Sequence, residues 1–264
     1  MTWSRVWNWT RGPLAALLVL AMARPVWKAF AEQRPLNSWY FPRLFAAWSF
    51  TLLFAFACLA IGVRIVKALT GPVARDGFWP LSFAMGVLAF GVSMGLLGHL
   101  QLLGPLTFGL LPLVLLGAGW GALTEEVFAA RQRWKREPPF TPLELGFGAA
   151  GVIGIFLAFL PVLAPENVNY DARWYHLAIA ERYALVGGIT RSVEGNHLLA
   201  GPHLASLLYT WAFLRDGTSL FERVLLANHL EVVCFLGTLA LIPSLARTLM
   251  PPGTKVSVYE VTWP

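Results

Sequence analysis

A run of polar, ionisable and aromatic residues, NYDARWYH (169–176), lies in a long polar segment between two hydrophobic stretches. Asp171 is its acid, and a carboxylate at a membrane–water boundary can accept a proton from a hydroxyl group or ligate a divalent cation such as Mg²⁺ or Mn²⁺. Tyr175 follows about one helical turn later, and His176 lies nearby on an adjacent face. These residues are the best candidates for chemistry, and simple helix capping is the alternative role for Asp171.

Four more side chains near this run are candidates for binding a substrate. Arg173 and Arg182 are suited to a lipid phosphate, because a guanidinium group matches phosphate oxygens with two hydrogen bonds. His197 and His203 lie where the polar segment re-enters a hydrophobic stretch, and they could bind the same phosphate or, with Asp171, help to hold a cation. Ordinary contact with headgroups or water is the alternative for each of them.

The composition is that of an integral membrane protein. Of the 264 residues, 57% are hydrophobic and only 13% are charged, whereas a soluble domain carries roughly 25% charged residues. The net charge of +6 comes largely from basic residues in short connections between hydrophobic stretches, so membrane topology explains it better than nucleic-acid binding does. Cys58 and Cys234 both lie inside hydrophobic stretches and argue against a zinc site or a disulfide framework.

Seven hydrophobic stretches predict an all-α, polytopic membrane helix bundle with about seven transmembrane helices. They are residues 13–30, 44–63, 78–98, 105–123, 145–164, 198–214 and 224–245. The first is weak and also fits a cleavable signal peptide. The sixth is short and is interrupted by Gly201-Pro202-His203. We expect an N-terminal membrane region (1–137), a second membrane region (138–250) and a tail (251–264).

The basic residues predict the orientation of the chain. Positively charged loops remain cytoplasmic, and the charged connections follow the second and fourth stretches, at Arg64, Lys67, Arg75, Arg131, Arg133, Lys135 and Arg136. The connection 99–104 has no Lys or Arg. We therefore expect a cytoplasmic N-terminus and an outer loop at 165–203. Arg215 and Arg223, after the sixth stretch, are then expected on the cytoplasmic side.

Within the outer loop, residues 172–186 are predicted to form an amphipathic helix that lies on the membrane surface. Its residues at helical spacing include Trp174, Leu177, Ala178, Glu181 and Leu185. Asn169 or Asp171 is placed to cap its start, and Gly187-Gly188 is expected to end it.

Small residues indicate which spans pack closely, because they allow helix backbones to approach each other in lipid. A four-residue repeat of small side chains runs along the fifth stretch, at Gly146, Ala150, Gly154 and Ala158. The third and fourth stretches contain the pairs Gly91/Gly95 and Gly117/Gly121.

Two segments carry a resemblance to a known family. Residues 166–189 read ENVNYDARWYHLAIAERYALVGGI, and residues 196–209 read NHLLAGPHLASLLY. They resemble segments of bacterial membrane glycosyltransferases with the GT-C fold, which are related to the family-39 dolichyl-phosphate-mannose mannosyltransferases and to RgtA/B/C/D-like enzymes. The second resembles the stretch that opens the next helix in those enzymes. The resemblance covers roughly residues 145–250.

This resemblance implies an enzyme of the bacterial inner membrane that passes a sugar from a polyprenyl-phosphate donor to an acceptor on the outer face. In the family, an acidic residue in an outer loop is essential as a general base or through a metal ion, and Asp171 matches that position. Ala172 follows it, where several members have a second acid. Such enzymes normally continue through several more helices, so the resemblance also fits a truncated or split member.

Two other classes of function stay open on the sequence. One is a non-catalytic membrane subunit that partners a longer transferase. The other is a small transporter in which Glu231 and His229, near the start of the last stretch, form a relay, since ionisable residues inside a membrane are usually functional. Polyprenyl-phosphate sugar, membrane lipids and a partner subunit are therefore the expected binding partners, and a nucleic acid is not.

Overall fold

The structure is a computed structural model, and it describes residues 28, 40–71, 77–134, 142–163, 175–190 and 204–249. The chain divides into two compact units, Met1–Ala46 and Ala47–Pro264. The first unit contributes Lys28 and the start of the first long helix to the described residues. All contacts given below lie within the second unit.

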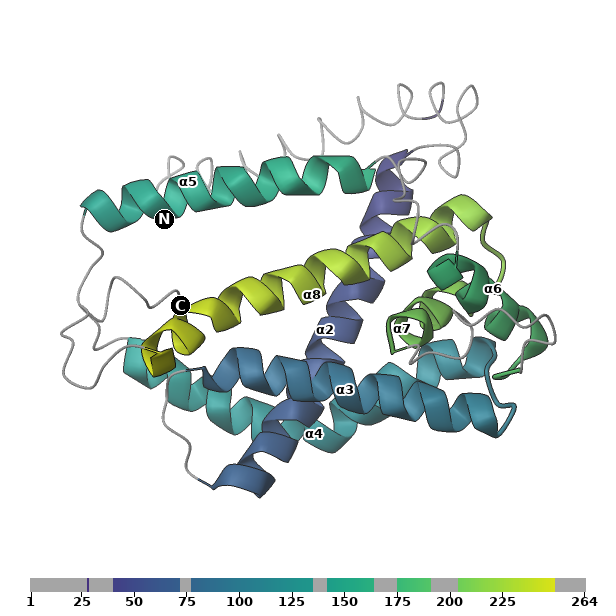
Figure 1. Ribbon diagram of the computed structural model, residues 1–264, viewed down its shortest axis with the longest axis horizontal. Helices are drawn as coiled ribbons and strands as arrows, with labels where there is room; N and C mark the ends of the chain where they lie inside the picture. The colour runs from purple at the N-terminus through teal and green to yellow at the C-terminus, as the bar shows by residue number, and fades with distance from the viewer. Residues whose placement is uncertain are drawn as a thin grey trace, which may run out of the picture. The chain divides into compact units, whose positions relative to one another are not determined.

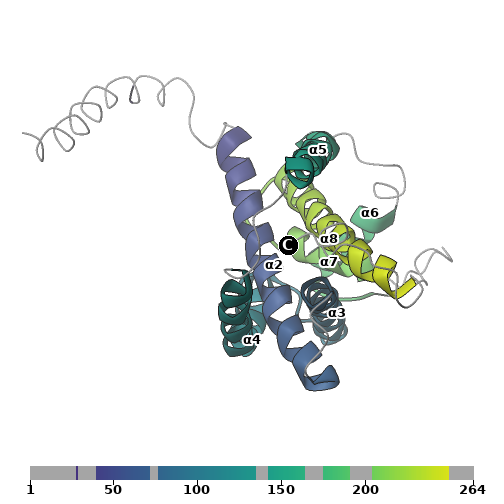
Figure 2. The same cartoon turned by 90° about the vertical axis from the view of Figure 1, so that its left-hand side faces the viewer.

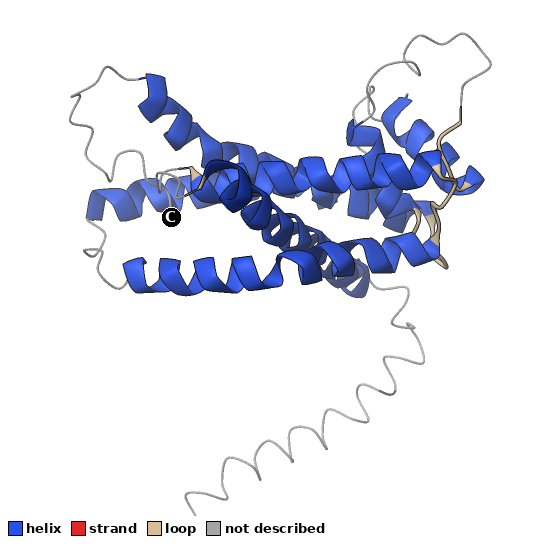
Figure 3. Cartoon of the chain, turned by 90° about the horizontal axis from the view of Figure 1, so that it is seen from below, coloured by secondary structure: helices blue, strands red, loops and turns tan. Residues whose placement is uncertain are grey.

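The described part of the chain is helical, and Figure 3 draws no strand in it. Its elements are α2 (Tyr40–Thr70), α3 (Phe78–His99), α4 (Pro105–Trp134), α5 (Pro142–Phe159), the 3₁₀ turn η2 (Leu160–Leu163), α6 (Leu177–Val186), α7 (Leu204–Phe213) and α8 (Leu220–Leu249) (Figure 1). Five segments are long and apolar enough to cross a membrane: Tyr40–Thr70, Phe78–His99, Pro105–Arg133, Leu145–Leu163 and Leu220–Ala246. The prediction of an all-α, multi-pass membrane bundle is confirmed.

Helices α2, α3 and α4 contact one another at glycine residues, where no side chain separates the backbones. A Cβ atom on Gly86 of α3 would overlap the backbone of Cys58 in α2, and a Cβ on Gly62 would overlap the carbonyl of Ser82. In the same way, Gly119 of α4 lies directly against Ala60 of α2. Figure 2 shows α2 passing between α4 and α3. Close backbone approach therefore sets the spacing of these three helices.

We define two ends of this bundle. The turn end contains the short connection between α3 and α4, and the opposite end contains the last turn of α2 and the C-terminal half of α4. At the opposite end, Lys67 of α2 lies 3.4 Å from Glu126 and 3.6 Å from Glu125 of α4. Glu126 also pairs with Arg133 at 2.7 Å.

Helix α8 runs antiparallel to α3 and begins at the turn end. Its Gly237 contacts Phe83, and its Ser244 contacts Gly77, which precedes α3. Just before α8, the guanidinium of Arg215 lies 4.9 Å from the ring centroid of Phe50. Because the Phe50 ring packs on Phe108 in the first turn of α4, Arg215 also lies toward the turn end.

This arrangement corrects the prediction for the sixth stretch. Within the described residues it contains α7, a helix of ten residues, which is about 15 Å long and half the ~30 Å thickness of the hydrocarbon layer. Residues 187–189 on one side of it and Arg215 on the other both lie toward the turn end. Helix α7 therefore does not cross the bundle, and the prediction that Arg215 and Arg223 share a side with Lys67 is wrong. The first predicted span lies outside the described residues.

The small-residue predictions have mixed outcomes. Gly91 and Gly95 receive Leu204 and Leu207 of α7, as the pair predicted. By contrast, a Cβ atom on Gly117 or Gly121 in α4 would meet no described residue within 4 Å, since the neighbouring Gly119 faces α2. The predicted packing stripe on α5 is likewise unpacked in the described structure: Gly146 and Gly154 have open space around them, and Ala150 and Ala158 are exposed.

We predict that Gly86→Ala destabilises the protein while Gly121→Ala does not. The added methyl group at residue 86 overlaps the backbone of α2, and such overpacking typically costs about 1–3 kcal/mol. At residue 121 the methyl group meets open space, and removing a helical glycine gains up to roughly 1 kcal/mol. Thermal unfolding of both variants in the same detergent checks this. Equal midpoints for the two variants would show that α2 and α3 do not approach at Gly86.

Candidate functional site

Polar side chains from α7, α8 and the residues just before α6 meet in one cluster. His176, just before α6, lies with its Nδ1 3.0 Å from the Oγ of Ser206 in α7. Tyr209, on the same face of α7 one turn later, donates its hydroxyl proton to Glu231 of α8. The rings of His176 and Tyr209 are 6.2 Å apart and perpendicular to each other. We call these four residues the α6–α8 cluster.

Helix α6 is fixed to the turn end through its C-terminus. Gly187 adopts the left-handed conformation (φ 77°) that ends the helix, which confirms the predicted stop. Its carbonyl then accepts a hydrogen bond from the Leu103 amide at 2.9 Å, and the Ile189 amide donates to the Gly98 carbonyl at 2.9 Å. These two bonds tie the end of α6 to the α3–α4 turn.

Helix α6 has one face buried in the unit and another face exposed. Leu177, Ile179, Ala180 and Tyr183 are buried against the rest of the unit, whereas Leu185 is 75% exposed and Ala178 is also exposed. Both sets of positions fit a helical period, and packing on α7 selects between them. Burial raises the pKa of the Tyr183 phenol above its ordinary value, and the positive charge of Arg182 opposes that shift.

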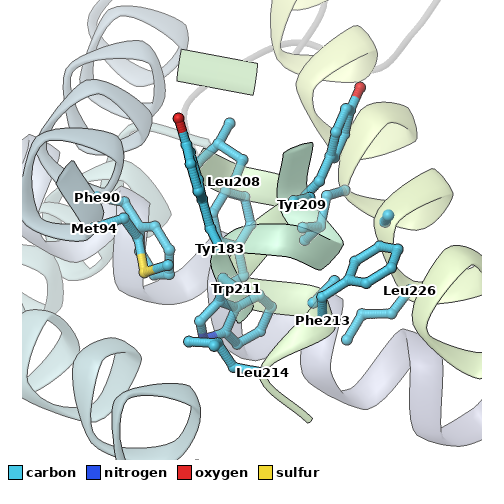
Figure 4. Close-up of a cluster of buried hydrophobic side chains, with 14 of the residues drawn as sticks. Phe90, Met94, Tyr183, Leu208, Tyr209, Trp211, Phe213, Leu214 and Leu226 are labelled. Carbon is cyan, nitrogen blue, oxygen red and sulfur yellow. The ribbon is translucent and has the colours of Figure 1, made fainter. Parts of the chain in front are cut away.

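An aromatic core holds α7 in place below the polar cluster. Trp211 is fully buried, stacks on Phe108 at 4.8 Å between ring centroids, and lies edge-on to Phe90. Its indole nitrogen donates to the Phe108 carbonyl at 3.0 Å. Figure 4 shows Tyr183 and Tyr209 with their hydroxyl groups pointing away from Trp211. The α7 backbone is thereby fixed so that Tyr209 faces Glu231.

Glu231 occupies an unusual place on α8. Glu231 is exposed. Exposed apolar residues continue along the same face of α8: Phe235, Ile242, Leu245 and Leu249. Such a stripe is what a membrane helix presents to lipid, whereas an ionised carboxylate facing lipid is costly. Among the described residues, the hydrogen bond to Glu231 comes from Tyr209. Glu231 therefore marks the point where the apolar stripe meets the polar cluster.

His229 lies on a different side of α8. Its Nδ1 is 2.7 Å from the Leu225 carbonyl of its own helix. Its ring packs on Trp48 and Phe159, with distances of 5.0 Å and 5.5 Å between ring centroids. The Nε2 atom is buried and has no hydrogen-bond partner among the described residues. Because residues two positions apart in a helix do not face each other, His229 and Glu231 contact different neighbours.

The predicted site residues divide into two groups. Asp171, Arg173, His197 and His203 lie outside the described residues. Tyr175 packs its ring on His176 at 4.1 Å, and Arg182 is exposed on α6. Of the predicted residues, the structure brings only His176 into the polar cluster. Sequence reasoning missed Ser206 and Tyr209, and it assigned Glu231 to a separate relay with His229. The one sequence feature that could have indicated Ser206 and Tyr209 was the spacing of their hydroxyl groups, three residues apart in an apolar helix.

The described residues contain no group of three or more His, Cys, Asp or Glu side chains placed to hold a metal ion. Comparisons with protein-family models, with curated proteins and with solved structures found no match. Fold and contacts thus define a multi-pass helical membrane protein with a polar cluster shared by three helices.

We predict that Tyr209→Phe lowers the free energy of unfolding by about 0.5–2 kcal/mol, because it leaves the Glu231 carboxylate without its donor. Thr210→Val is the matched control. Thr210 is also buried in α7, but the hydrogen bond of its hydroxyl among the described residues is to the Ser206 carbonyl of the same helix, at 2.7 Å, and such back-bonding adds little stability. Unfolding in one detergent measures both variants. A Tyr209→Phe variant as stable as Thr210→Val would contradict the contact.

Proposed function

We propose that this protein is a membrane glycosyltransferase that moves a sugar from a polyprenyl-phosphate donor to an acceptor on the outer face of the bacterial inner membrane. One observation supports the proposal above the others. The two segments that resemble GT-C enzymes, 166–189 and 196–209, meet at a side-chain contact, between His176 in the first and Ser206 in the second. The two resembling segments are thus brought together at a polar contact, as residues of one site would be.

Asp171 is the proposed general base. It stands four positions before Tyr175 in the sequence, and four residues of fully extended chain span at most roughly 14 Å. Chain length therefore limits the distance between Asp171 and Tyr175, which packs on His176 of the α6–α8 cluster. Its carboxylate takes the proton of the acceptor hydroxyl while that oxygen attacks the anomeric carbon of the sugar.

The leaving group is the lipid phosphate, which departs with the electrons of the broken carbon–oxygen bond. A single displacement of this kind inverts the anomeric configuration. Arg173, Arg182, His197 and His203 are the proposed phosphate ligands, since positive charge and hydrogen-bond donors stabilise the departing phosphate. Tyr175 and His176 are the proposed sugar contacts. A divalent cation such as Mg²⁺ or Mn²⁺, if bound, would add positive charge at the phosphate.

In this proposal the turn end faces outward. The connection 99–104 at that end carries no Lys or Arg, whereas Arg64, Lys67, Arg131 and Arg133 gather toward the opposite end, in keeping with cytoplasmic basic loops. Arg215 and Arg223 then lie on the outer side, where headgroup phosphates are available to them.

A non-catalytic membrane subunit is the second candidate, and the unpacked α5 favours it. The apolar window of that helix has no buried residue, and its small-residue stripe is open, as for a helix that packs on another protein. The transporter relay has weaker support, because Glu231 bonds to α7 while His229 packs between Trp48 and Phe159.

We predict that Asp171→Asn abolishes transfer. A strain lacking the protein, complemented with this variant at matched expression, should accumulate a polyprenyl-phosphate sugar and lack one residue in a surface glycan, as the uncomplemented strain does. Mass spectrometry of lipids and glycans measures both. Asp216→Asn is the control, because Asp216 is an exposed acid that bonds to the adjacent Gly217 amide, and it should restore the wild-type profile. Restoration by Asp171→Asn as well would make Asp171 a helix cap and end the catalytic hypothesis.

A further inference from the structure

We infer that Glu231, held in place by Tyr209, forms a subsite that binds hydroxyl groups of the transferred sugar. The inference rests on the proposed function and adds a residue from the last described helix to the site. Glu231 belongs to neither of the two segments that carry the family resemblance. The contact with Tyr209 connects it to the second of them.

Glu231 lies level with the middle of α3. Gly237 of α8 packs on Phe83 of α3, and the two helices are antiparallel. Glu231 comes six residues before Gly237, so it lies roughly level with Ala89, the midpoint of α3 (Phe78–His99). This level is far from both ends of α3, and hydrocarbon beside the middle of a membrane-spanning helix supplies no hydrogen-bond donor.

The Glu231 carboxylate has more hydrogen-bond sites than it has partners among the described residues. An ionised carboxylate has about four lone-pair sites, and among the described residues Tyr209 fills one of them, at Oε1. Glu231 is exposed, so its other lone-pair sites are accessible to a ligand. A ligand with several donors satisfies them at lower cost than lipid does.

The chemistry of the neighbours points to a polyhydroxyl ligand. Around Glu231, the cluster offers a phenol, a serine hydroxyl and an imidazole, with no second carboxylate among its members. A metal ion would need more acidic or imidazole ligands together than the described residues provide. Sugar hydroxyls donate to a carboxylate in charge-assisted hydrogen bonds, and the rings of Tyr175 and His176, which pack on each other at 4.1 Å between centroids, add aromatic surface to the cluster.

The test is a comparison of binding with and without the sugar. The probes are farnesyl phosphate and its glucose, mannose, galactose and arabinose derivatives, titrated against the purified full-length protein in lipid nanodiscs. The wild-type protein should bind at least one sugar derivative more tightly than farnesyl phosphate. Glu231→Ala should reduce that preference at least tenfold. The preference is the ratio of two affinities, one for a sugar derivative and one for farnesyl phosphate. Both ligands carry the phosphate, so any effect of the lost Glu231 charge on phosphate binding cancels in this ratio.

Thr238→Ala is the matched control, since Thr238 is exposed on α8 and bonds to the Cys234 carbonyl of its own helix; it should keep the full preference. Glu231→Gln keeps the shape of the side chain and should lose about threefold or more, so the test holds even where Glu231→Ala fails to fold. If both Glu231 variants keep the wild-type preference, Glu231 does not bind the sugar, and the transferase proposal stands without this subsite. If the wild-type protein prefers no sugar derivative, the transferase proposal falls and the subsite with it.

Discussion

The short length of α7 is the constraint on which the rest of the structure depends. Ten residues of helix reach only halfway through a hydrocarbon layer, so this segment cannot expose polar backbone ends to lipid and must be enclosed by protein. Helices α3, α4, α6 and α8 all contact it. The fully buried Trp211 and the glycines of α3 make that enclosure close-packed. In consequence α8 starts at the turn end and runs back antiparallel to α3.

The same constraint accounts for the position of the polar residues. A helix enclosed on most sides inside the bundle can carry polar side chains that a lipid-facing helix cannot. Ser206 and Tyr209 use that freedom, and each reaches a polar partner on a different neighbour, His176 before α6 and Glu231 on α8. The cluster is therefore a product of how α7 is packed, and the aromatic core beneath it keeps the three helices in register.

The long spans were predictable because apolar runs of about twenty residues carry their own signal. Their ends were less so. Helix α2 extends to Thr70, beyond the predicted end at residue 63, because Arg64 and Lys67 reach the Ala118 carbonyl and the acids of α4. Hydropathy alone could not identify α7 as a helix that does not cross, although Gly201-Pro202 interrupted its stretch. The buried face of α6 was also undetermined, because its sequence fits two helical faces and only the contact with α7 selects one.

For the candidate site, the sequence identified His176 through the NYDARWYH run and marked Glu231 as an expensive residue for a membrane helix. It could not pair them with Ser206 and Tyr209. A single hydroxyl in an apolar helix is common, and the partners lie 30 and 22 residues away in the sequence. Such pairings depend on the tertiary packing of α6, α7 and α8, for which a local pattern carries no information.

The most direct test of this account is the sidedness of the connection between α7 and α8. Single cysteines replace Leu100 in the α3–α4 turn, Asp216 after α7, or Gln132 near the end of α4, in a protein whose Cys58 and Cys234 are changed to Ala. All three sites are exposed in the structure. With a membrane-impermeant thiol reagent applied to intact cells and to inverted vesicles, residues 100 and 216 should react from one side and residue 132 from the other. Reaction of residue 216 from the same side as residue 132 would mean that the α7 segment crosses the membrane, and the account would be wrong.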